Sequence, residues 1–180
     1  MIAEHEIIIG NTGGDRIAQK IAHALREWGN NAIILDINNK LFFLTEKEQK
    51  RKGRIFKLKL DSEGVFPITV SKIIRKATIY FELKNKNIKM ASKNLDALFN
   101  YFLISNFKHP ILIVLDGLQT LKKLHSLPRL IKEGSSKNIR LLIPIFVSNI
   151  EDLMHLLKKI GYDKSEIDMF LNNCKIIKMC

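Results

Sequence analysis

The fold of this chain is decided near its start, by the stretch Ile7-Ile8-Ile9-Gly10-Asn11-Thr12-Gly13-Gly14-Asp15-Arg16-Ile17. An apolar run that ends in glycines and continues into an amphipathic segment predicts a strand, a tight loop and a helix. The backbone N–H groups of such a loop, together with the helix N-terminus, can bind a phosphate group. We therefore predict a phosphate-binding loop over residues 10–17. An ordinary glycine-rich turn between a strand and a helix is the alternative that the pattern leaves open.

The predicted loop lacks the side chains that phosphate chemistry needs. Nucleotide-binding loops follow the pattern G-x-x-x-x-G-K-[ST], in which the lysine reaches the β- and γ-phosphates and the hydroxyl holds Mg²⁺. With Gly10 as the first glycine, Asp15 replaces the second one. Arg16 then stands for the lysine and Ile17 for the hydroxyl residue. An Asp15 carboxylate would repel phosphate oxygens, a planar guanidinium does not replace a compact ammonium, and Ile17 offers no ligand to Mg²⁺. We expect no tight binding of ATP and assign no cofactor.

Length and composition predict one domain over residues 1–180. With 180 residues and 46% hydrophobic residues, the chain can bury a sizeable core. No apolar stretch approaches the roughly 18 residues of a membrane span, and the first residues lack a positive leader, so we expect a cytoplasmic protein. The two cysteines, Cys174 and Cys180, are predicted to be free thiols. Because they and the five histidines lack ligand spacing, no metal site is predicted.

The charge is strongly positive, at +12 from 30 Lys and Arg against 18 Asp and Glu. Such an excess attracts polyanions, and nucleic acid is the obvious candidate. The densest basic cluster consists of Lys47, Lys50, Arg51, Lys52 and Arg54. No aromatic residues are interleaved with it, so the sequence does not indicate a base-stacking platform. A lysine-rich solvated surface is the alternative explanation.

Short apolar runs alternate with amphipathic segments along the chain. The predicted strands are 5–9, 32–36, 77–82, 111–115, 139–146 and 174–178, and the predicted helices are 15–28, 41–52, 92–107, 119–133, 149–160 and 163–171. Residues 54–74 stay unassigned, with an extra strand as one option, because Gly64 and Pro67 interrupt them. This alternation predicts a three-layer α/β fold with a mainly parallel sheet.

In such sheets, ligands bind beyond the carboxyl ends of the strands. Gly10, Asp36, Asp116 and Ser148 follow or end predicted strands. Asp116 ends a buried run, as the Walker-B aspartate that faces Mg²⁺ does in ATPases, but Gly117 occupies the place where many of them have a catalytic glutamate. Both aspartates have a structural alternative as caps of the next helix or turn.

Taken together, several blocks of the sequence resemble the TraD/TraG-type coupling proteins of conjugation and type IV secretion. The blocks are Ile8-Ile9-Gly10-Asn11-Thr12-Gly13-Gly14, Trp28-Gly29-Asn30-Asn31-Ala32-Ile33-Ile34-Leu35-Asp36, Ile113-Val114-Leu115-Asp116-Gly117-Leu118-Gln119-Thr120-Leu121, Leu127-Pro128-Arg129-Leu130-Ile131-Lys132-Glu133-Gly134, Ile160-Gly161-Tyr162 and Leu171-Asn172-Asn173-Cys174-Lys175-Ile176. The resemblance implies a RecA-like P-loop domain. Members of that family form hexameric rings, hydrolyse ATP and deliver DNA or protein to a secretion channel.

The resemblance also implies which chemical groups this chain has lost. Beside Arg16, Ile17 and Gly117, Ser135 stands for the arginine after the Glu-Gly pair, and Ser148 stands for the glutamine that ends the next strand. Asp116 alone is retained. Because phosphoryl transfer depends on positioned charges, we expect a pseudo-ATPase that binds a coupling-protein ring or nucleic acid, such as DNA. A weak or partner-completed ATPase and a basic nucleic-acid-binding module are the alternatives.

Overall fold

The computed structural model describes residues 4–10, 15–73, 77–84 and 86–179. Seven strands in this part of the chain form one sheet in the order β3-β4-β2-β5-β6-β1-β7, and every neighbouring pair is parallel. The strands are β1 (His5–Gly10), β2 (Asn31–Asp36), β3 (Arg54–Lys59), β4 (Ala77–Glu82), β5 (Ile111–Asp116), β6 (Ile139–Ile145) and β7 (Cys174–Met179). The predicted α/β class with a parallel sheet is confirmed.

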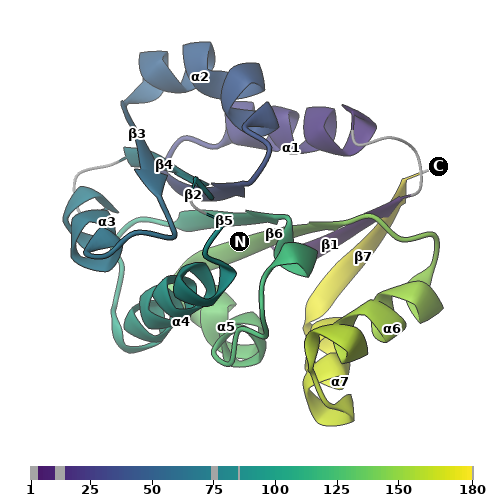
Figure 1. The fold of residues 1–180 in the computed structure, drawn as a ribbon. Coiled ribbons are helices and arrows are strands. Elements are labelled where there is room, and N and C mark those ends of the chain that lie inside the picture. The colour runs from purple at the N-terminus through teal and green to yellow at the C-terminus, as the bar shows by residue number, and fades with distance from the viewer. Residues whose placement is uncertain (1–3, 11–14, 74–76, 85, 180) are drawn as a thin grey trace.

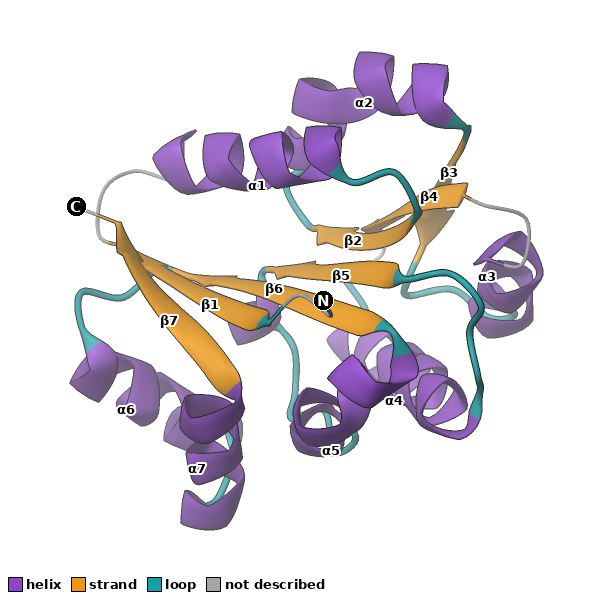
Figure 2. Cartoon of the chain, turned by 180° about the vertical axis from the view of Figure 1, so that it is seen from behind, coloured by secondary structure: helices purple, strands orange, loops and turns teal. Residues whose placement is uncertain are grey.

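Helices cover both faces of the sheet, which gives the three layers (Figure 1). One face carries α1 (Asp15–Glu27) and α2 (Lys40–Lys52). The opposite face carries α3 (Val65–Ile73), α4 (Ile88–Ile104), α5 (Leu127–Glu133), α6 (Ile150–Ile160) and α7 (Lys164–Asn173). Figure 2 shows from behind that α6 and α7 lie under β1 and β7, on the other side of the sheet from α1.

The alternation of side chains along each strand builds two cores. Ile33 and Leu35 of β2 face the core under α3–α7, whereas Ala32 and Ile34 face the core under α1 and α2. Because the central strands are covered on both sides, they are apolar at nearly every position, as expected for parallel strands. The two edge strands differ: β3 carries Lys57 and Lys59, and β7 carries Lys175 and Lys178. Lysines on an edge strand oppose pairing with another chain.

Of the unassigned residues 54–74, the structure describes 54–73, which contain strand β3 and helix α3. Pro67 lies in the first turn of α3, where a missing backbone N–H costs little. Thr69 Oγ1 donates a hydrogen bond to the Val65 carbonyl at 2.8 Å, inside the same helix. The extra strand that the sequence allowed is β3, which pairs with β4 and forms one edge of the sheet.

The prediction of one continuous helix over residues 119–133 was wrong. A short 3-10 turn at Leu118–Thr120 is followed by an irregular segment, and α5 starts only at Leu127. The Asp96 carboxylate on α4 accepts hydrogen bonds from the backbone N–H groups of His125 at 3.1 Å and Ser126 at 2.9 Å. Asp96 therefore supplies the hydrogen-bond acceptors that these two N–H groups would otherwise have found inside a continuous helix.

All strands are parallel, so their carboxyl ends lie along one side of the sheet, which we call the carboxyl edge. The strand order decides which chain segments meet there. β2 and β5 are direct neighbours, so Asp36 and Asp116 lie side by side in register. β6 lies between β5 and β1 and separates Asp116 from Gly10 by one strand. Among the helices of the described residues, none combines the length and the apolar character that crossing a bilayer requires.

Candidate functional site

Asp36 ends β2 and holds the start of α2. Its side chain is 1% exposed, and its two carboxylate oxygens accept the backbone N–H groups of Leu41 at 3.2 Å and Phe42 at 2.7 Å. Burial raises the pKa of Asp36, and these hydrogen bonds oppose the rise. The structural alternative for Asp36, a cap for the next helix, is therefore confirmed.

Asp116 differs from its neighbour because its carboxylate has no hydrogen bond to any residue that the structure describes. Burial, and then the charge of Asp36, raise the pKa of Asp116 to about 6, while Lys40 opposes the rise. A carboxylate with a raised pKa at the ligand-binding edge of a sheet is a candidate for binding a cation or moving a proton. Within the described residues, however, no cluster of three or more metal-ligating side chains surrounds it.

Lys40, which sequence reasoning missed, completes this charge cluster. Its ammonium forms an ion pair with the carboxylate of Asp15, at the start of α1. A cation in the first turn of a helix is unfavourable for the helix dipole, and this was the available signal in the sequence. The carboxylate at the start of α1 is thus not an unpaired charge. The expected repulsion between Asp15 and a phosphate is correspondingly weaker than the sequence alone suggests.

The predicted phosphate loop is only partly within the described residues, since Asn11, Thr12, Gly13 and Gly14 lie outside them. At Gly10, an added Cβ would lie 3.0 Å from the Met179 carbonyl oxygen and 3.4 Å from Ile17 Cδ1. Close packing by β7 therefore accounts for the glycine at this position. Ile17 is 1% exposed and packs into the core under α1, while Arg16 is exposed.

Gly117 is required by the local backbone. It has φ +100°, and an added Cβ would lie 2.5 Å from Ile37 Cδ1. Its carbonyl accepts hydrogen bonds from the Thr120 backbone N–H at 2.9 Å and from Thr120 Oγ1 at 2.7 Å. A glutamate side chain at this position would clash with Ile37 and strain the left-handed turn. The local backbone thus disfavours the catalytic base that the resemblance would place here.

The two other positions named by the resemblance, Ser148 and Ser135, lie at opposite ends of the strands. Ser148 follows the carboxyl end of β6, on the same edge as Asp116. Ser135 lies near the amino end of β1, where its Oγ is 3.4 Å from His5 Nε2. Within one chain, Ser135 is therefore not part of the cluster around Asp116.

The basic cluster lies away from the aspartates, along the end of α2 and the start of β3. Lys50 forms an ion pair with Glu46, and Lys52 Nζ donates a hydrogen bond to the Trp28 carbonyl at 3.3 Å. Lys47, Arg51 and Arg54 are exposed. Basic residues also suit the last turn of a helix, because its carbonyl end carries partial negative charge.

The chain matches no protein-family model, no curated protein and no solved structure. The resemblance to TraD/TraG-type coupling proteins therefore stays a prediction that depends on the sequence blocks alone. The arguments for a function come from the geometry of the carboxyl edge.

Proposed function

We propose that this chain is a catalytically degenerate RecA-like P-loop domain that binds or assembles with other molecules and is not a motor. The observation that carries the proposal is the packing of Ile17. This residue stands where a Mg²⁺-binding hydroxyl would be, and it is buried in the core between α1 and the sheet. A polar side chain at that point would need partners that this apolar core does not supply. At Gly117, where the catalytic glutamate would stand, the positive φ and the nearby Ile37 side chain disfavour any residue larger than glycine.

The arrangement of the sheet supports a nucleotide-enzyme ancestry for this binding domain. Gly10, Asp36 and Asp116 end strands at one edge, as the phosphate loop and the Walker-B aspartate do in α/β nucleotide enzymes. A coupling-protein ring of a type IV secretion or conjugation system is the partner that the resemblance implies. A partner of that kind would use the scaffold without requiring turnover of ATP by this chain.

Thermal melting with Mg-ATP tests the proposal. A ligand at 100 times its Kd stabilises a native protein by about 2.7 kcal/mol, which raises the Tm of a chain of this size by about 5–10 °C. We expect no such rise at millimolar Mg-ATP and no steady-state release of phosphate. Because the chain carries a charge of +12, magnesium tripolyphosphate at the same concentration is the matched control for unspecific polyanion binding. A rise with Mg-ATP that tripolyphosphate does not reproduce would contradict the proposal.

A weak or partner-completed ATPase is the second candidate, and Lys40 is the observation that favours it. Its ammonium lies at the carboxyl edge near Asp116 and Asp15, where it could replace the missing loop lysine. This candidate predicts phosphate release that falls about 100-fold or more in both Lys40→Met and Asp116→Asn, since loss of one stabilising charged group typically costs that much. Phosphate release that is unchanged in both variants would come from a contaminating enzyme.

A further inference from the structure

A second region of the molecule, on the face covered by α3–α7, contains an open cavity of about 700 Å³. It lies between α6 and the segment that connects the 3-10 turn to α5. The lining residues are Gln119, Leu121, Lys122, Lys123, His125, Leu156, Lys159 and Ile160. None of them belongs to the cluster of Asp15, Lys40, Asp36 and Asp116. Volumes of about 300–1,000 Å³ are typical of small-molecule sites.

The lining has an apolar wall and charges of one sign. Leu156 and Ile160 lie one turn apart on α6 and are half-buried. Among the described residues that line it, every charged side chain is a lysine and none is a carboxylate. A second cavity of about 430 Å³, between α6 and α7, has Glu151, Asp163 and Asp168 next to its lysines, so no single sign prevails there. Of these two cavities, the larger one has the lining that favours an anionic ligand.

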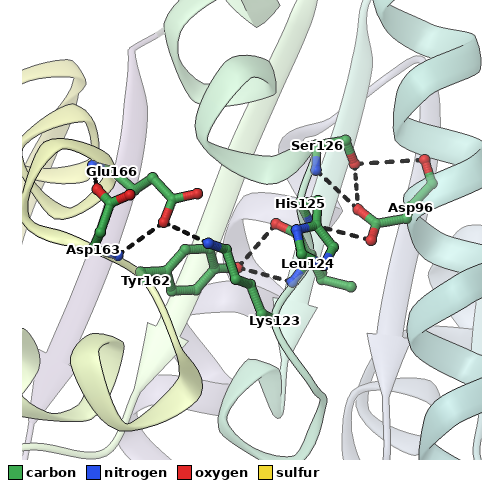
Figure 3. A network of polar contacts seen from close by, with 8 residues as sticks. All are labelled: Asp96, Lys123, Leu124, His125, Ser126, Tyr162, Asp163 and Glu166. Carbon is green, nitrogen blue, oxygen red and sulfur yellow. Dashed lines mark hydrogen bonds and ion pairs between the residues drawn. The ribbon is translucent and has the colours of Figure 1, made fainter.

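The wall opposite α6 is held in place before any ligand binds (Figure 3). The Tyr162 hydroxyl accepts a hydrogen bond from the Leu124 backbone N–H at 3.2 Å and lies 3.3 Å from the Leu124 carbonyl oxygen. Lys123 Nζ forms an ion pair with Glu166 at 2.7 Å. With the Asp96 contacts to His125 and Ser126, these bonds hold residues 123–126 of the segment in place. A preformed wall lowers the entropic cost of binding.

We propose that this cavity binds a small amphiphilic anion, with a carboxylate, sulfonate or phosphate head and an apolar body. Lys123 is already paired with Glu166, so Lys122 and Lys159, both exposed, are the cations for the head. Leu121, Leu156 and Ile160 contact the body. Medium-chain fatty acids belong to this chemical class. The inference does not depend on the proposed function, because the two sites share no residue.

Fluorescence titration of the full chain with 8-anilinonaphthalene-1-sulfonate, an aromatic sulfonate, tests the proposal, with decanoate as competitor. We expect saturable binding and displacement of the probe by decanoate. Lys122→Glu/Lys159→Glu should weaken probe binding about tenfold, because both exposed cations for the head are lost and the reversed charges repel it. Lys47→Glu/Arg51→Glu makes the same change in net charge on α2, across the sheet, and should leave binding within about twofold.

Equal affinity of the two double variants would overturn the proposal, as would displacement of the probe by 1-decanol as readily as by decanoate. Displacement by an acidic peptide but not by decanoate would assign the cavity to a protein partner and would also overturn it. If Lys122→Glu/Lys159→Glu unfolds, as judged by circular dichroism, the neutral pair Lys122→Gln/Lys159→Gln is measured against Lys47→Gln/Arg51→Gln. The same criteria then apply, with a smaller expected loss of about threefold.

Discussion

At the scale of single residues, His5 is a buried imidazole at the amino end of β1. Its Nδ1 accepts the Leu141 backbone N–H at 3.1 Å, and its ring packs so closely on Gly134 that an added Cβ there would lie 3.2 Å from it. Burial, with a smaller contribution from the charge of Arg140, lowers the pKa of His5 to about 4, and the Ile131 backbone opposes the shift. The imidazole is therefore neutral in the native protein at neutral pH.

This lowered pKa predicts acid sensitivity. Because the unfolded chain binds a proton at the ordinary histidine pKa of 6.5 and the folded chain only near 4, the stability linked to His5 is present above pH 6.5 and is lost as the pH falls toward 4. The loss should amount to about 2–3 kcal/mol. Urea unfolding between pH 4 and 7 measures it, and His5→Gln should flatten the slope. Exposed His155 provides the control His155→Gln. Parallel slopes for His5→Gln and the native chain would refute this role.

Asp116 predicts the opposite pH dependence. Its folded pKa of about 6 lies above the ordinary value of 3.8, so the folded state is penalised above pH 6 and the penalty disappears as the pH falls below 3.8. Asp116→Asn should therefore stabilise the chain by about 1–2 kcal/mol at pH 8 and change little at pH 3.5. Denaturant unfolding of Asp116→Asn and of the exposed-site control Asp168→Asn measures the difference. Destabilisation at pH 8 would mean that the charge of Asp116 has a partner in solution.

At the scale of elements, the segment before α5 depends on contacts with other helices. Asp96 on α4 accepts two backbone N–H groups and the Ser126 hydroxyl, the last at 2.6 Å. Asp96→Ala should destabilise the chain by about 2–3 kcal/mol, because hydrogen bonds to a charged group are lost and the part-buried donors of Ser126 are left unpaired. The control is Asp168→Ala, at an exposed position of α7. Thermal unfolding with equal midpoints for the two variants would show that this network is dispensable.

At the scale of the whole molecule, charge is unevenly placed. The aspartates with Lys40 lie at the carboxyl edge of the sheet, and the basic cluster lies along the end of α2 and the start of β3. The net charge of +12 alone would bind DNA without a specific surface. A local DNA-binding site can be distinguished from this general attraction by reversing the same number of charges on two different surfaces and comparing DNA affinity.

If α2 and β3 form a nucleic-acid surface, Lys47→Glu/Arg51→Glu/Arg54→Glu should weaken DNA binding about tenfold more than Lys158→Glu/Lys164→Glu/Lys175→Glu. The two variants have equal net charge, and all six positions are exposed. Fluorescence anisotropy with a short duplex at two salt concentrations gives both affinities. The slope of affinity against salt should also be smaller in the first variant, because fewer counterions are released. Equal losses of DNA affinity in the two variants would show that binding depends on net charge and not on a surface formed by α2 and β3.

The sequence by itself determined the layered α/β class and the parallel sheet. The apolar runs that form β1, β2, β4, β5 and β6 are local patterns, and a strand buried on both faces needs no distant information to be recognised. The placement of Asp36 and Asp116 at the carboxyl ends of strands was predictable for the same reason. The cap formed by Asp36 was one of the alternatives that the sequence offered.

Only the tertiary structure decided which of those strand ends meet. The neighbouring positions of β2 and β5, the ion pair between Lys40 and Asp15, and the break before α5 all join residues far apart in the chain. The burial of Ile17 and the close approach of Ile37 to Gly117 also appear only when helices and strands are packed together. Local patterns encode the elements, whereas the energies of burial and of charge pairing depend on neighbours that the fold alone supplies.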